Sequence, residues 1–194
     1  MFTSIAIFLL TGLISCKSDR KFADDFLEFW TEVKNNYAYF NKKHTDWNKV
    51  KAVYLPQAEN AKDKNELITV FENALEELYD NHFSLNTNLL SSTRLVPTGL
   101  DIWAEWMNHK PIITEVRKGF SADHAGVRNG MEIISINGIL IEQAVNNRIG
   151  KCINKIDLEV KNYALRQLLA GTYLTKTVLA VKEDGKTYTI NLDK

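Results

Sequence analysis

Proline, glycine and cysteine are all scarce in this sequence. Its 194 residues include three prolines, nine glycines and two cysteines. These numbers exclude a collagen-like or low-complexity architecture, a disulfide scaffold and a four-thiolate zinc site. Because 45% of the residues are hydrophobic and 25% are charged, we expect a globular chain with a buried core.

An excess of charge of either sign is also absent. The 24 Lys and Arg residues balance the 24 Asp and Glu residues, so the formal net charge is zero. Without a basic field to attract phosphate backbones, nucleic acid is not an expected partner. No His-Glu-x-x-His motif, cysteine pair or acidic cluster offers the spacing of metal ligands, so we expect neither a metal nor another cofactor.

The apolar run near the start of the chain is too short to cross a bilayer. Residues 1–16 carry no charge, and their apolar run at 5–10 is typical of a secretory signal peptide. The uncharged segment ends at Leu13-Ile14-Ser15-Cys16, which resembles a bacterial lipobox. Cys16 would then be lipidated and anchor the protein to a membrane of the cell envelope, in the periplasm or at the cell surface. The alternative is a frayed apolar N-terminus. We interpret Cys152 as a small buried hydrophobic residue.

The hydrophobic period between residues 21 and 79 predicts three helices. An aromatic stripe from Phe22 to Tyr37 marks the first. Asp46 and Asp63 are expected N-caps of the second and third, with Glu66 in capping-box register, and Pro56 should kink or shorten the second helix.

After residue 80 the pattern changes to that of strands. Strands are expected at 83–85, 99–106, 112–116, 132–136, 177–182 and 186–192, the last two joined at Asp184-Gly185. A helical turn is expected at 121–126 and a helix at 157–170, closed by Gly171. We therefore predict an α+β chain: a signal peptide at 1–16, a helical domain at 17–90 and a β-rich domain at 91–194, docked as one body.

The β-rich part contains a recognisable glycine pattern. Residues 119–127, followed by Gly130-Met131-Glu132-Ile133-Ile134-Ser135-Ile136-Asn137-Gly138, resemble a stretch of PDZ domains. The resemblance implies that polypeptide C-termini bind beside a strand, with the terminal carboxylate held by a loop at 99–102. It implies a groove formed by Gly99, Leu100, Ile102, Leu165 and Leu168.

Together, the helices, an Asp80-Asn81-His82 turn and the PDZ-like part resemble the N-terminal half of the carboxyl-terminal processing proteases, especially their tricorn-like branch. That resemblance implies that His82 is the general base of a serine peptidase, a role that suits imidazole. The alternative is a histidine that only hydrogen-bonds the backbone.

The family places its nucleophilic serine after the PDZ module. We expect no serine of this chain to fill that role, and a base alone cannot run acyl transfer. One hypothesis is therefore a non-catalytic N-terminal part of a serine peptidase. The others are a standalone peptide-binding lipoprotein and a degenerate paralogue without activity. Whether the chain belongs to an active enzyme, and its oligomeric state, stay open at this point.

Overall fold

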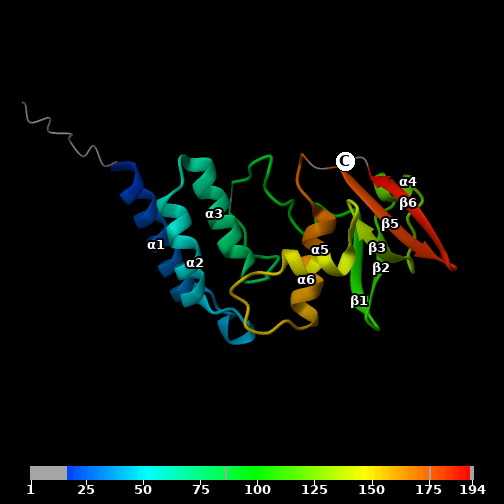
Figure 1. The fold of residues 1–194 in the computed structure, drawn as a ribbon, viewed down its shortest axis with the longest axis horizontal. Helices are drawn as coiled ribbons and strands as arrows, with labels where there is room; N and C mark the ends of the chain where they lie inside the picture. Colours follow the sequence, from blue (N-terminus) through cyan, green and yellow to red (C-terminus); the bar gives the residue numbers. More distant parts are fainter. Residues whose placement is uncertain (1–16, 86, 175, 193–194) are drawn as a thin grey trace, which may run out of the picture.

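The computed structural model describes residues 17–85, 87–174 and 176–192 of the chain. Cys16 and the predicted signal peptide lie outside these residues. The described part is mixed α+β, as predicted, with a helical region followed by a sheet domain. Figure 1 shows α1, α2 and α3 at one end of the molecule, the sheet at the other, and α5 and α6 between them.

The three predicted N-terminal helices are confirmed. They are α1 (Lys17–Asn36), α2 (Trp47–Glu59) and α3 (Lys64–Glu76), with a short 3-10 turn, η1 (Phe40–Lys42), after the first. Asp46 and Asp63 cap α2 and α3 by accepting backbone N–H groups of the first turn. Pro56 does not shorten α2, which continues to Glu59.

The core of the helical region is aromatic. Trp30 donates its indole N–H to the backbone carbonyl of Trp47 at 2.7 Å, and Trp47 donates its own indole N–H to the backbone carbonyl of Trp30 at 3.0 Å. Phe26, Leu78 and Cys152 are fully buried beside them. Cys152 comes from the C-terminal half of the chain, so this core contains residues from both regions. Its burial confirms the role as a small buried hydrophobic residue that was predicted for it.

The sheet is antiparallel throughout, with the order β1-β2-β3-β5-β6. β4 pairs only with β3, so β1 and β6 form the two edges of the described sheet. Its strands are β1 (Ile102–Met107), β2 (Lys110–Val116), β3 (Glu132–Ile136), β4 (Ile139–Leu140), β5 (Thr177–Glu183) and β6 (Lys186–Leu192).

Three helices accompany the sheet: α4 (Ser121–His124), α5 (Ile141–Arg148) and α6 (Leu158–Ala170). The expected helical turn, the expected long helix with its Asp157 N-cap and Gly171 C-cap, and the final hairpin are confirmed. The sequence prediction missed α5. The expected strand at 83–85 is wrong: the backbone N–H of Phe83 donates to the carbonyl of Asp80 in a turn, and none of the described strands pairs with this segment.

Short polar contacts join the helical region to the sheet domain. The Glu77 carboxylate, fully buried at the end of α3, accepts the backbone N–H groups of Lys151 and Cys152 and the hydroxyl of Tyr54. Beside it, Arg148 of α5 forms two hydrogen bonds with Glu76. The end of α3 is therefore held by both regions at once.

Candidate functional site

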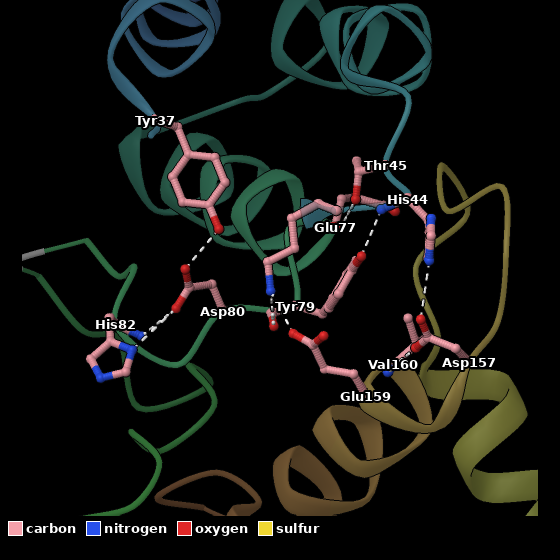
Figure 2. A network of polar contacts seen from close by, with 11 residues as sticks. Tyr37, His44, Thr45, Glu77, Tyr79, Asp80, His82, Asp157, Glu159 and Val160 are labelled. Carbon is pink, nitrogen blue, oxygen red and sulfur yellow. Dashed lines mark hydrogen bonds and ion pairs between the residues drawn. The ribbon is translucent and has the colours of Figure 1, made fainter. Parts of the chain in front are cut away.

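The turn that follows α3 contains the candidate base. Asp80 Oδ1 accepts the backbone N–H of His82 at 2.9 Å and lies 3.3 Å from the ring nitrogen Nδ1 of the same residue. Asp80 Oδ2 accepts the phenol of Tyr37, from the end of α1, at 2.7 Å. Figure 2 shows Asp80 between these two side chains. The carboxylate thus fixes the turn and faces one nitrogen of the imidazole.

The environment of Asp80 favours its charged form. Burial alone would raise the pKa of this carboxyl group, but hydrogen bonds from Tyr37 and from His82, together with the positive charge of Lys43, hold the pKa below its usual value. The pKa of Tyr37 is raised, first because the phenol is buried and then because its proton is shared with Asp80. Asp80 is therefore an anion that can orient a histidine.

His82 itself is open to solvent. Its side chain is 98% exposed, whereas that of Asp80 is only 13% exposed. Beside the ring lies a hollow of about 400 Å³, whose wall includes Val33, Tyr37, Tyr39 and Phe83. With Nδ1 turned toward Asp80, the other ring nitrogen, Nε2, is available to a group that approaches from outside.

A second set of contacts holds the backbone just before this turn. Lys43 Nζ donates to the carbonyl of Tyr79 at 3.3 Å and to Glu159 of α6 at 2.7 Å. Next to it, the backbone N–H of His44 donates to the phenol of Tyr79. The His44 ring lies 3.1 Å from Asp157, the N-cap of α6. As Figure 2 shows, these contacts link the turn to the first residues of α6.

The residues predicted to form a peptide groove lie around β1 and α6. Leu100, Ile102 and Leu165 are buried in the core of the sheet domain, and Leu168 packs against that core while partly exposed. The N–H groups of Gly99 and Leu100 donate within their own loop, to the carbonyls of Leu95 and Pro97. A carboxylate held by these groups would need the loop to change, and the peptide-binding role of the five residues stays a prediction.

The outer edge of β1 is covered by α6. Asn162 of α6 accepts the backbone N–H of Trp106 at 2.8 Å with its side chain. One turn later the Arg166 guanidinium lies 3.9 Å from the ring centre of Trp103 and pairs with Glu105. A peptide that adds to β1 as a strand must therefore displace side chains of α6.

Sequence reasoning found His82 but missed the residues that support it. Tyr37 and Lys43 are separated from Asp80 by about forty positions, and no local pattern relates them. Within the described ranges, no three His, Cys, Asp or Glu side chains are placed to hold a metal ion. Nor is any helix of those ranges both long and apolar enough to span a membrane.

Residues 18–76 match the family model of the Tricorn protease C1 domain. The match covers α1 to α3 and ends just before the Asp80-Asn81-His82 turn. It agrees with the tricorn-like resemblance that the sequence suggested for the helical region. A search of curated proteins finds no match.

Solved structures of CPAF share the fold over most of this chain. Mature CPAF bound to lactacystin is 14% identical, with a TM-score of 0.63 over 92% of this chain and 35% of that chain. A CPAF mutant gives 14% identity and a TM-score of 0.62 over 91% and 34% of the two chains. The photosystem II D1 C-terminal processing protease is 18% identical over 92% of this chain and 44% of that chain, with a TM-score of only 0.36.

These comparisons show a helical region that matches the Tricorn protease C1 domain and a fold that is shared with CPAF. The present chain spans about a third of the length of the CPAF chains that it matches. The likeness to CPAF concerns the fold, since the identity is low. The family match concerns the helices that lead into the candidate base.

Proposed function

We propose that this chain is a non-catalytic N-terminal part of a serine-type peptidase of the carboxyl-terminal processing family, and that His82 is its general base. The observation that carries the proposal is the Asp80–His82 pair directly after helices that match the Tricorn protease C1 domain. The exposure of the imidazole supports the same role, because a base must reach a nucleophile outside its own turn.

The chemistry follows from the two ring nitrogens. Asp80 favours the tautomer with a proton on Nδ1, which leaves a lone pair on Nε2. Nε2 would take the hydroxyl proton of a serine as the serine oxygen attacks a peptide carbonyl, and Asp80 would stabilise the resulting imidazolium. Among the described residues no serine hydroxyl is hydrogen-bonded to His82, so a catalytic domain would have to supply the nucleophile.

The test of activity begins with the DNA sequence that follows the codon for Lys194. We expect no labelling of the 194-residue chain by a fluorophosphonate probe. If the DNA encodes a serine-containing domain after Lys194, the joined polypeptide should be labelled. His82→Ala should then lower its labelling rate about a thousandfold or more. His109→Ala is the matched control and should change nothing. Labelling of the isolated chain, or normal labelling of the His82→Ala polypeptide, would contradict the proposal.

We also propose that the sheet domain binds polypeptide C-termini along the edge of β1. What supports this is that β1 is an edge strand whose Trp106 N–H is bonded by a side chain, Asn162, and not by another strand. A side-chain acceptor is easier to exchange for a peptide carbonyl than a strand partner would be. An apolar last residue is expected because Leu168, which packs against the core while partly exposed, offers it aliphatic surface.

Fluorescence polarisation with labelled peptides tests this binding mode. A peptide with a free, apolar C-terminus should bind, and its amidated form should bind much less. Leu168→Lys should weaken binding, whereas Asn162→Ala should strengthen it because the Trp106 N–H is released. Equal binding of the free and amidated peptides, or no binding of either, would refute the proposal.

The predicted lipid anchor is the third part of the proposal. It rests on the lipobox-like residues Leu13 to Cys16, and would place the protein in the bacterial cell envelope. A single acyl chain binds a membrane only marginally, but a processed lipoprotein carries several. Mass spectrometry of the membrane fraction should find Cys16 as the acylated first residue. An intact Met1 and an unmodified Cys16 on soluble protein would exclude the anchor.

A further inference from the structure

The hollow beside the imidazole of His82 is apolar over most of its wall. Its volume of about 400 Å³ is within the range of small-ligand sites. It opens between the end of α1 and the turn after α3, and the rings of Tyr37, Tyr39 and Phe83 line it together with Val33. Tyr39 is 51% exposed. The hollow therefore has both the room and the apolar surface to receive a side chain of another molecule.

Two carboxylates, Glu32 of α1 and Asp80, belong to the same wall. Among the described residues that line it, no lysine or arginine is present. The positive charge of Lys43 already acts on Asp80. Glu32 is exposed, its carboxylate accepts the side-chain amide of Asn36 at 2.8 Å, and within the described ranges it forms no ion pair. Glu32 is thus the anion that is left for a ligand, next to the apolar surface.

The chemistry proposed for His82 determines which part of a substrate lies beside this hollow. After the serine has attacked, the imidazolium donates the proton on Nε2 to the peptide nitrogen as the carbon–nitrogen bond breaks. The acyl group stays on the serine oxygen, and the nitrogen leaves as the amine of a new N-terminus. For this transfer the nitrogen must come within about 3 Å of Nε2. The residue that carries this nitrogen therefore lies next to the ring, and next to the hollow that His82 helps to line.

The released amine matches the wall in charge. The pKa of an α-amino group is about 8, so at neutral pH most of it is ammonium. Glu32 can accept an N–H group of this ammonium while the side chain of the same residue enters among the aromatic rings. A large apolar side chain buries the most surface there, and an aromatic one can also pack edge-to-face on those rings.

We propose that this hollow binds the residue on the leaving side of the cleaved bond, that it prefers a large apolar side chain, and that Glu32 binds the new α-ammonium group. The inference rests on the proposed function and deepens it, because it gives the site of His82 a substrate class. Val33, Tyr39 and Phe83 determine the preference for an apolar side chain. The edge of β1 and a terminal carboxylate play no part in this binding.

Three dipeptide amides test this subsite on the complete 194-residue chain, labelled with ¹⁵N. Phe-Ala-amide, which has a free amine, should shift the backbone resonances of Asn36, Tyr39 and His82 with millimolar affinity. Its acetylated form should bind about three to five times more weakly at low ionic strength, and this difference should disappear at about 0.5 M salt because the pair with Glu32 is exposed. Gly-Ala-amide should bind about tenfold more weakly or worse, because it lacks the apolar side chain.

Glu32→Gln separates the effect of the charge from that of the hollow. The amide keeps an acceptor for Asn36, and the variant should bind Phe-Ala-amide only as well as the acetylated form binds to the wild type. Glu59→Gln, exposed at the end of α2 and outside the hollow, is the matched control and should leave both affinities unchanged. Ala38→Arg places a cation in the wall itself and should weaken the binding of Phe-Ala-amide about tenfold or more.

Four results would overturn the inference. They are the absence of shifts at the hollow, shifts confined to β1, equal affinity for Phe-Ala-amide and Gly-Ala-amide, and an identical response to Glu32→Gln and Glu59→Gln. All these measurements report binding alone and need no nucleophile. If fluorophosphonate labelling of the joined polypeptide depends on His82 but the hollow binds no dipeptide, the proposed function stands and this subsite fails.

Discussion

Glu77 and Cys152, 75 positions apart, are joined by a buried hydrogen bond of 2.8 Å from the backbone N–H of Cys152 to the carboxylate of Glu77. The same carboxylate accepts the N–H of Lys151 and the hydroxyl of Tyr54. The side chain of Glu77, the C-cap of α3, therefore satisfies two backbone groups of the loop between α5 and α6. This contact ties the helical region to the sheet domain only three residues before Asp80.

Replacing Glu77 should strongly destabilise the protein. Glu77→Leu leaves three donors without an acceptor, two of them buried, and we expect the free energy of unfolding to fall by about 3 kcal/mol or more. Glu77→Gln keeps one acceptor oxygen and should cost less. Urea unfolding followed by circular dichroism measures both. Glu28→Gln, on the exposed face of α1, is the control, and a loss of similar size there would show that the buried contact is not the cause.

Gly150 should not tolerate a side chain. A Cβ atom at this position would collide with Glu77 Oε2, so the contact between Glu77 and the loop between α5 and α6 would have to open. We expect Gly150→Ala to lower the free energy of unfolding by about 1 to 3 kcal/mol. Gly185→Asn is the comparison, because that turn has open space around it and asparagine tolerates its positive φ. Equal losses in the two variants would contradict the steric explanation.

The contribution of the Asp80 carboxyl group to the free energy of unfolding should depend on pH. Its pKa is lowered in the folded protein, so its contribution is fully present above the unfolded value of about 4 and is lost as the pH falls through the folded value. Tyr37→Phe removes one donor and should raise the pKa of Asp80, as measured by NMR titration of the carboxyl carbon. Asp80→Asn should flatten the acid side of the stability curve, whereas Asp24→Asn should not. An unchanged titration in Tyr37→Phe would rule out this role of the phenol.

Arg148 should not be replaceable by lysine. The guanidinium forms two hydrogen bonds to Glu76 and one to Thr93, and an ammonium group cannot reproduce that geometry. Arg148→Lys should cost about 1.5 to 3 kcal/mol in the free energy of unfolding. Arg128→Lys disrupts a bidentate pair of the same kind with Glu183, but on the surface, and should have no measurable effect. If both variants left the free energy of unfolding unchanged, the contact between the helical region and the sheet domain would not depend on the Arg148–Glu76 pair.

The sequence was most informative where a local pattern decides the structure. Asp46, Asp63 and Asp157 cap helices, and Asp184-Gly185 forms a tight turn, because short-range hydrogen bonds and backbone angles control both features. The helix α5 was missed because the residue at its N-cap, Leu140, has no side chain that can cap a helix. Phe83 and Leu85 alternate with polar residues, as in a strand. A strand forms only where another strand can pair with it, and the sequence pattern does not show whether such a partner is present.

The candidate site was predictable only in part. His82 follows from a resemblance, but its support by Tyr37 and Lys43 depends on how α1 and η1 pack against the end of α3. The expected groove shows the same limit. The sequence places Leu165 and Leu168 on one helix, yet only the packing buries the first in the core and leaves the second partly exposed against it.

The contact between Arg166 and Trp103 gives this protein a built-in optical reporter. The guanidinium lies over the indole ring, and the indole N–H donates to Glu105, so the emission of Trp103 depends on whether α6 covers the edge of β1. Trp30 and Trp47 are buried in the distant helical core and should contribute a constant background. Trp106, also on β1 and in contact with Asn162 and Lys161 of α6, should respond together with Trp103. Stopped-flow fluorescence can therefore follow the uncovering of β1 in real time without any attached dye.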